Sequence, residues 1–178
     1  SDVQSNNEGT PIGVGNWPSW IVVDSQGRAH VTTQNDLVTI TGTDTSKQGL
    51  PNSFGIAYNP TNERLYTASG ATLTVWDVSG AGDPTIVAIV PKTSPEFGLD
   101  TVAVNPASGR VFVTGRANLS SKLGVVDGNT NAWLSANYSI GSYDLNGGMM
   151  RGISFNSHNG YVYVSNELFN RVYVFEDS

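Results

Sequence analysis

The chain has 178 residues, a formal net charge of −6 and only nine Lys and Arg residues, none of them in a basic run. This argues against nucleic acid and against an anionic membrane surface as partners, because both require clustered positive charge. Cysteine is absent, which excludes disulfides and thiolate metal sites, and no run approaches the roughly 18 apolar residues of a membrane span. The length suits one domain, residues 1–178.

The N-terminal segment holds one short candidate strand. Residues 1–9 are polar, whereas Thr10–Val14 carries an apolar pair just before Asn16-Trp17-Pro18. The start at Ser1 rather than Met suggests that a leader or a larger precursor has been removed.

Four copies of one pattern follow this segment. Each copy has three short runs of alternating apolar residues separated by turn-forming residues, which predicts an antiparallel meander of three strands. The copies align with Val22, Ala57, Ala103 and Ser154 in register, at intervals of roughly 35 to 50 residues. A period of this size with several short strands is typical of β-propeller blades.

A fourth strand is predicted between successive copies. The apolar runs Thr85–Val90 and Ala132–Ile140 supply it for the second and third repeats. The first repeat offers only the polar sequence GTDTSKQGLP between Thr41 and Asn52, which predicts a short or missing strand there. No long stretch has a 3.6-residue apolar period, so the fold is expected to be all-β.

The last repeat ends after three strands, and the N-terminal segment is one strand in excess. We therefore expect Thr10–Val14 to pair with Arg171–Phe175 and to close the ring, because closure removes exposed sheet edges. The predicted fold is a β-propeller of four blade-like, four-stranded repeats closed by an N-terminal strand. The expected boundaries are repeats at 16–52, 53–95, 96–145 and 146–178 and a closing strand at 10–15.

An Asx residue opens the first hairpin turn of every repeat: Asp24, Asn59, Asn105 and Asn156. Such a side chain can accept a hydrogen bond from the backbone two residues on, and Gly or Asn at the end of the turn accepts a positive φ. The pattern predicts Asx turns. A ring of metal ligands is the alternative.

The second and third strands resemble one known repeat family. The N-P-x-x-G/N-R turn, the second strands Val111–Gly115 (VFVTG) and Val162–Asn166 (VYVSN) and the V-x-V-x-D third strands are similar to the YVTN (surface-layer, lactonase-like) β-propeller repeat. The resemblance covers nearly the whole chain. It implies a propeller scaffold, although members usually carry seven blades and this chain supplies four.

Motifs for catalysis are absent from the sequence. It has no G-x-S-x-G, H-E-x-x-H, P-loop or dinucleotide-binding motif, and its two histidines, His30 on a second strand and His158 at a hairpin tip, are placed too far apart to share a site. Asp127–Asn131 (DGNTN) resembles the opening of a calcium loop but lacks its later ligands, so a turn is the main interpretation and calcium the alternative. No cofactor and no metal ligand is otherwise predicted.

A ligand is expected on the face formed by the loops that lead into the first strands and by those that join the second strands to the third. This loop face carries aromatic, acidic, basic and amide side chains, which suit a small polar ligand or a peptide. The candidate ligand-binding residues are Trp20, Asp36, Phe54, Asp100, Arg116, Arg151 and Glu167. The alternative is a plug along the axis of a narrow ring, with Asp100 and Arg151 as an ion pair.

The predicted function is a non-enzymatic, extracellular binding or structural module that recognises a protein or a glycan, or that associates with copies of itself. Its surface must be built from uncharged polar residues, and two sequons, Asn118 and Asn137, are candidate glycosylation sites of a secreted protein. The alternatives are a lactonase-like metal-dependent hydrolase, a fragment of a larger propeller, or half of a ring completed by a second chain. Trp76, Phe112 and Tyr163 are expected to be buried between repeats.

Overall fold

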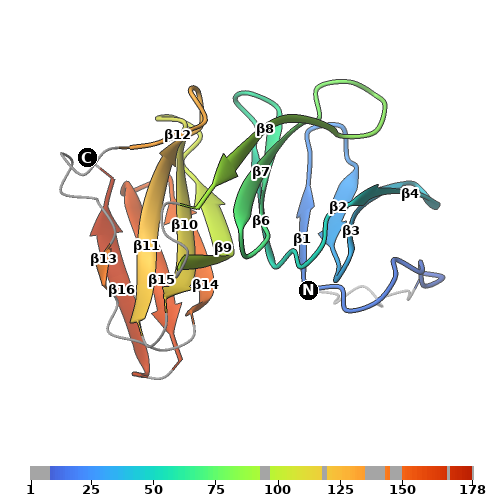
Figure 1. The fold of residues 1–178 in the computed structure, drawn as a ribbon. Helices are drawn as coiled ribbons and strands as arrows, with labels where there is room; N and C mark the ends of the chain where they lie inside the picture. Colours follow the sequence, from blue (N-terminus) through green and yellow to red (C-terminus); the bar gives the residue numbers. More distant parts are fainter. Residues whose placement is uncertain are drawn as a thin grey trace, which may run out of the picture.

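The computed structural model describes residues 9–92, 97–117, 120–134, 143–144, 150–167 and 169–177. Within these residues every helix or strand assigned is a β-strand, and the strands form four antiparallel sheets that stand side by side (Figure 1). The all-β prediction is confirmed. No helix in the described part of the chain is long and apolar enough to cross a membrane.

Each sheet consists of strands that are consecutive in the sequence. The first sheet contains β1 (Trp20–Val23), β2 (Ala29–Thr32), β3 (Asp36–Thr41) and β4 (Asp44–Gly49). The second contains β5 (Gly55–Asn59), β6 (Arg64–Ala68), β7 (Thr72–Asp77) and β8 (Thr85–Pro91). The third contains β9 (Phe97–Val104), β10 (Arg110–Ala117), β11 (Ser120–Asp127), β12 (Ala132–Trp133) and β13 (Tyr143–Asp144). The fourth contains β14 (Met150–Asn156), β15 (Tyr161–Asn166) and β16 (Arg171–Glu176).

The fourth strand of the first sheet is complete, so the prediction that it is short or missing was wrong. β4 pairs with β3 along its whole length, from Thr41↔Asp44 to Asp36↔Gly49. The hairpin turns at Gly42, whose φ of +64° suits a residue without a side chain. β4 is the outermost strand of its sheet, and most of its side chains are exposed. It therefore forms without alternating apolar and polar residues.

The predicted ring closure within one chain is also corrected. Residues 10–14 form no strand, and β16 pairs with β15 alone among the described strands. The reason is their position: β1 contacts β5, β5 contacts β9 and β9 contacts β14, so the sheets run in a row. The segment before β1 and the strand β16 lie at opposite ends of this row (Figure 1).

All four predicted Asx turns are present. The side-chain oxygens of Asp24, Asn59, Asn105 and Asn156 each accept a hydrogen bond of 2.9 Å from the backbone N–H two residues on. Gly27, Gly109 and Gly160 have positive φ at the ends of three turns, as expected. In the second sheet the positive φ falls on Glu63 instead of Asn62.

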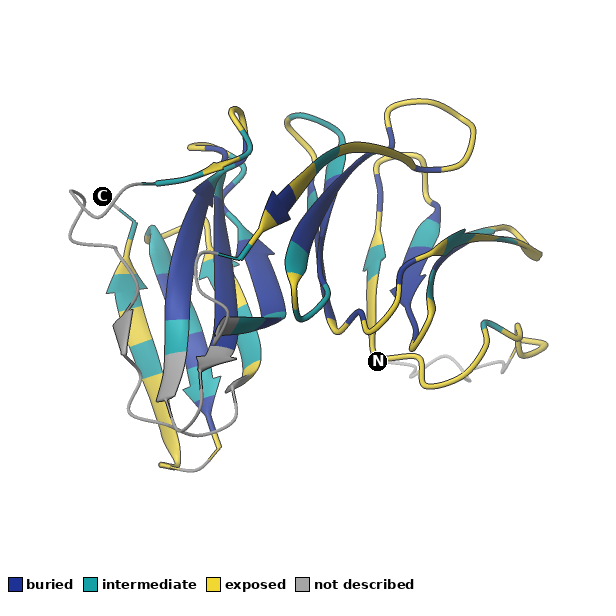
Figure 2. Ribbon diagram, in the orientation of Figure 1, coloured by how far each residue is buried: buried dark blue, intermediate teal, exposed yellow. Residues whose placement is uncertain are grey.

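The core consists of three apolar layers, one between each pair of neighbouring sheets. Figure 2 shows the buried residues concentrated on the strands in the middle of the row. Trp76 and Phe112 are buried in these layers, as predicted, whereas Tyr163 is half-buried because none of the described sheets covers its side of the fourth sheet. Neighbouring first strands approach closely: a Cβ on Gly55 would lie 2.6 Å from the Cα of Thr101.

Candidate functional site

A pocket on the loop face lies where the first sheet meets the second. It has a volume of about 210 Å³ and is lined by Trp17, Ser19, Gln34, Asn52, Ser53 and Phe54. Trp17 is 79% exposed and Phe54 is 44% exposed, so both rings are available to a ligand. We refer to this site as the Trp17–Phe54 pocket.

Backbone hydrogen bonds hold the walls of this pocket in place. Gln34 N–H donates to Asn16 C=O at 3.1 Å, and Asn52 N–H donates to Gln34 C=O at 2.8 Å. Phe54 N–H donates to Ala68 C=O of β6 at 2.9 Å. The pocket is therefore fixed by both sheets before any ligand arrives.

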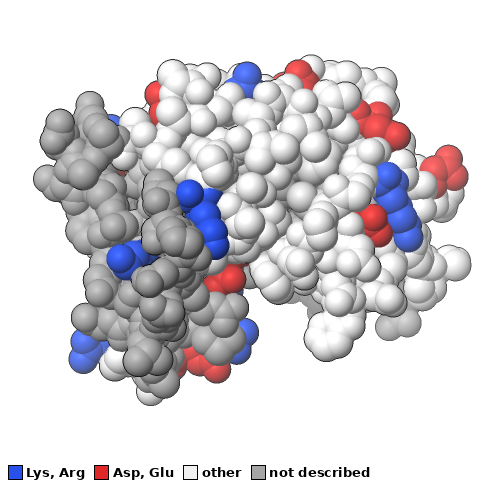
Figure 3. Space-filling model, in the orientation of Figure 1, with Lys and Arg blue, Asp and Glu red and all other residues white. Residues whose placement is uncertain are grey.

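The chemistry of the Trp17–Phe54 pocket is aromatic and uncharged. The side-chain amides of Gln34 and Asn52 make no hydrogen bond within the described part of the chain, so their donors and acceptors remain available to a ligand. No lining residue carries a charge. In Figure 3 the surface over the middle of the row is mostly white, and charged side chains on the right gather toward the outer edge of the first sheet.

A second group of predicted site residues lies at the other end of the row. Arg151 Nε, on β14, donates to a carboxylate oxygen of Glu167, which follows β15. This hydrogen bond, together with the charges of Glu167 and, to a smaller extent, Asp100, raises the pKa of Arg151. Both partners of this pair are more than half exposed. The alternative of an axial ion pair between Asp100 and Arg151 stays a prediction.

The structure separates the remaining predicted residues. Trp20 lines a different, apolar hollow, on the side of the first sheet that faces away from the second. Asp36 is half-buried at the start of β3, where its backbone N–H donates to Thr33 Oγ1 at 3.0 Å. Arg116 lies on β10, opposite Gly98 and Ser121. The sequons Asn118 and Asn137 lie outside the described residues.

A lactonase-like metal site would need Asp36, Asp100, Asn166 and Glu167 to converge. Asp36 lies in the first sheet and Glu167 follows β15 of the fourth, so these two carboxylates are not brought together. In the part of the chain that the structure describes, no group of three or more His, Asp or Glu side chains is placed to hold a metal ion. The segment Asp127–Asn131 forms a turn, in which Asp127 Oδ1 accepts the backbone N–H of Asn129 at 2.8 Å.

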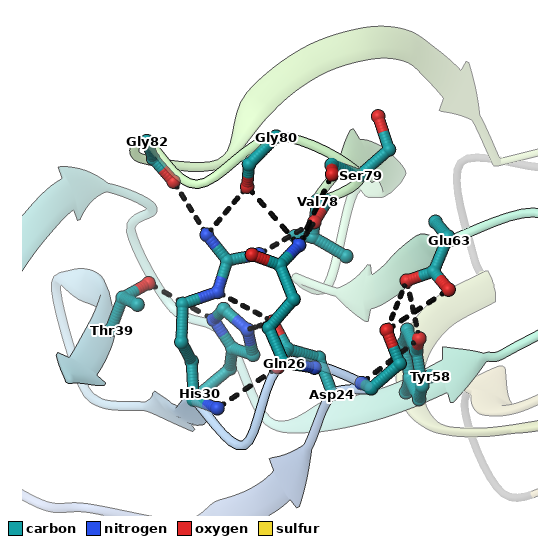
Figure 4. Close-up of polar contacts among 12 residues, drawn as sticks. Asp24, Gln26, His30, Thr39, Tyr58, Glu63, Val78, Ser79, Gly80 and Gly82 are labelled. Carbon is teal, nitrogen blue, oxygen red and sulfur yellow. Dashed lines mark hydrogen bonds and ion pairs between the residues drawn. The ribbon is translucent and has the colours of Figure 1, made fainter. Parts of the chain in front are cut away.

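A buried polar network, unexpected from the sequence, joins the first two sheets (Figure 4). His30 is fully buried, with Nε2 2.9 Å from Asp24 Oδ2 and Nδ1 3.0 Å from Thr39 Oγ1. Because a carboxylate only accepts, a neutral His30 donates through Nε2 and accepts the Thr39 hydroxyl at Nδ1. The arrangement has the residue types of a catalytic triad, yet it is closed to solvent and acts as part of the core.

Burial shapes the charge of this network. It lowers the pKa of His30 below the usual value, with a further contribution from the charge of Arg28, while the hydrogen bond to Asp24 opposes the change. Burial alone raises the pKa of Asp24, but hydrogen bonds from His30 and Arg28 outweigh it, and the pKa ends below its usual value. The stable state is thus a neutral imidazole beside an ionised carboxylate.

Arg28 extends the network to the second sheet. Its Nε donates to Asp24 Oδ2 at 2.7 Å, and its other nitrogens donate to the carbonyls of Val78 (2.5 Å), Gly80 (2.9 Å) and Gly82 (2.6 Å). The side chain is 4% exposed. It therefore links the turn of one sheet to the loop after the third strand of the next.

The same link is repeated along the row. Arg64 donates to Gly128 C=O at 2.9 Å, and Arg110 donates to the carboxylate of Asp177. Each arginine ends the Asx turn of its sheet and reaches the residue that follows the third strand of the next sheet. The Arg in the N-P-x-x-G/N-R turn, visible in the sequence, is thus a connector between neighbouring sheets.

Comparison with solved structures confirms the fold. The chain is similar to the β-propeller domain of Cps50 (Swd1) from Myceliophteria thermophila, with a TM-score of 0.70 and 10% identity, over 90% of this chain and 54% of that one. It is also similar to hydrazine synthase from Kuenenia stuttgartiensis, with a TM-score of 0.54 and 10% identity, over 100% of this chain and 67% of that one. The chain thus spans about half the length of the first propeller domain.

No protein-family model matches the sequence, and no curated protein is significantly similar to it. The resemblance to the YVTN repeat therefore stays a prediction. At 10% identity the structural likeness shows the fold alone, and the four sheets are blades of the β-propeller type.

Proposed function

We propose that the chain is a non-enzymatic, extracellular binding module that recognises an uncharged polar segment of a protein or a glycan in the Trp17–Phe54 pocket. The observation that carries the proposal is the pocket itself: two exposed aromatic rings beside two available amides, without a charge among them. Aromatic surface supplies contact area, and a few polar groups fix the orientation of a ligand.

The size of the pocket limits what it accepts. Pockets for drug-sized ligands usually measure about 300 to 1,000 Å³, and this one measures about 210 Å³. It suits a single side chain or a single sugar ring that projects from a larger partner. An uncharged partner also agrees with the low charge of the chain, 13% of its residues.

The test is binding to arrays of glycans and of peptides, followed by calorimetry on the ligand found. Trp17→Ala should weaken binding at least roughly tenfold, because it removes the more exposed of the two rings. Phe169→Ala is the matched control, since Phe169 is also an exposed aromatic residue but lies in the fourth sheet's loop. Equal loss in both variants, or none in Trp17→Ala, would contradict the proposal.

The enzymatic alternative has its own readout. Wild-type protein incubated with lactones or phosphate esters, with and without added divalent metal, should release no product above the rate in buffer. Turnover that Asp100→Ala or Arg151→Ala abolishes would overturn the non-enzymatic proposal.

A further inference from the structure

We infer that a second copy of this chain covers the two exposed ends of the row, so that two chains close one ring of eight blades. The inference does not depend on the Trp17–Phe54 pocket. It rests on two end faces. The leading end face is the side of the first sheet that turns away from the second, and the trailing end face is the side of the fourth sheet that turns away from the third.

The trailing end face carries apolar residues at positions that the repeat buries elsewhere. Val172 is 60% exposed, whereas its equivalents Leu37, Leu73 and Leu123 are all 0% exposed. Val174 is likewise exposed, and its equivalent Val75 is fully buried. These positions are buried in the other sheets because the next sheet packs on them.

The leading end face shows the same contrast on the opposite side. Ile21 is 61% exposed, whereas its equivalents Ile56 and Val102 are 5% and 6% exposed beneath the preceding sheet. A hollow of about 340 Å³ opens beside Ile21, and most of its lining is apolar: Val14, Pro18, Trp20, Val31 and Ile40. The first sheet thus presents a surface shaped like those that receive a preceding sheet.

The two end faces are complementary because of the repeat. Every internal interface places the trailing side of one sheet on the leading side of the next. The trailing face of one chain therefore fits the leading face of another by the contact that the fold already uses three times. Such a head-to-tail contact either closes into a ring or continues as a filament.

A missing strand points to the same pairing. Along the chain β4 is followed by β5, and β8 is followed by β9. Each fourth strand therefore pairs in one sheet and leads into the first strand of the next sheet. By this rule residues 10–14, which precede β1, belong to a sheet in front of the first. Among the described residues the fourth sheet has three strands, and it lies at the opposite end of the row from residues 10–14. Residues 10–14 of one copy would thus complete the fourth sheet of the other.

The length of the row suits closure with two chains. Aligned with a solved propeller domain at a TM-score of 0.70, the chain covers 54% of that domain, so two copies supply about the length of one such domain. Two such halves give eight blades, within the range of about four to eight blades found in propellers. A closed ring leaves neither end face exposed, whereas a filament always leaves two.

The first test is the mass in solution, by light scattering across a range of protein concentrations. We expect two chains, each of 18.9 kDa. Ile21→Asp should weaken the association by roughly a hundredfold, because it places a charge in an apolar interface. Ile89→Asp is the matched control: Ile89 is 59% exposed, on the outer strand of the second sheet, and its substitution should leave the mass unchanged. A monomer at high concentration, or an open filament, would overturn the inference.

The second test uses the absence of native cysteine. A mixture of Ile21→Cys and Val174→Cys chains should be joined by a bifunctional thiol reagent that spans one core layer, because the equivalent residues Val102 and Val75 lie in the same layer. A mixture of Ile21→Cys and Val87→Cys should not, since Val87 lies on the outer strand β8. Cross-linking of Ile21→Cys to itself would show a symmetric contact between leading faces and would refute head-to-tail closure.

Discussion

Replacing Arg28 with Met tests whether the polar network between the first two sheets holds the fold together. The change keeps most of the apolar stem of the side chain and removes all of its donors. Asp24 then loses its ion pair at 2.7 Å, and the carbonyl of Val78 loses a partner at 2.5 Å. The carboxylate is left ionised in a site where its side chain is 0% exposed.

The expected loss of stability is about 3 to 5 kcal/mol, the usual cost of removing one partner from a buried ion pair. The carbonyls of Gly80 and Gly82 add little to it, because both residues are exposed and water can replace the arginine. The total stability of a domain is about 5 to 15 kcal/mol. Arg28→Met should therefore remove about a fifth of it or more.

The assay is unfolding in urea, followed by tryptophan fluorescence at one fixed protein concentration. Arg171→Met is the control, since Arg171 is exposed and should cost less than about 0.5 kcal/mol. The double variant with Asp24→Asn should cost less than the sum of the two single changes, because Asn removes the unpaired charge. A loss below about 1 kcal/mol for Arg28→Met would show that the network contributes little to the fold.

Three further changes have expected outcomes. Burial lowers the pKa of His30 in the folded state, so the unfolded chain takes up a proton at this residue first as the pH falls below about 6.5. The free energy of unfolding should therefore decrease with acidification. His30→Gln should flatten this dependence in urea titrations at several pH values. Trp76→Ala should cost about 3 to 5 kcal/mol in the same assay, because the ring is buried and its Nε1 donates to Thr67 at 2.9 Å. Gly55→Ala should lower the melting temperature, because the new Cβ would lie 2.6 Å from the backbone of Thr101; an unchanged melting temperature would show that β5 and β9 can separate without cost.

The sequence predicted those strands that are covered by neighbours. A middle strand such as β6 or β10 must alternate apolar and small residues to pack between two sheets, so its pattern carries the signal. β4 has the sequence DTSKQG and pairs with β3 along its whole length. Its residues face mainly solvent, so its sequence shows no alternation of apolar and polar residues. A polar outermost strand such as β4 is therefore what such patterns miss, whereas the apolar outermost strand β8 was predicted.

The candidate site was predictable only in part, and for a related reason. Phe54 was placed on the loop face from its position before a first strand, and it lines the pocket. Asn52 and Ser53 were missed because they follow β4, the strand that the sequence did not reveal. The partnership of Asp24 with His30 was missed because it depends on the register of β1 with β2, in which Val22 lies opposite His30.

Phe112 and Tyr163 occupy the same position in successive repeats, and their difference shows what a repeat sequence leaves open. Phe112 is 1% exposed because the fourth sheet covers it, whereas none of the four described sheets lies in front of Tyr163. Phe112→Ala should cost about 3 to 5 kcal/mol at any protein concentration. Tyr163→Ala should cost much less when the chains are dilute and separate, and its cost should rise with concentration as a second copy covers the ring. Urea titrations at two concentrations a hundredfold apart measure this difference. A cost for Tyr163→Ala that does not change with concentration would mean that the aromatic residue of the last repeat remains uncovered, and that its position in the repeat does not indicate a partner.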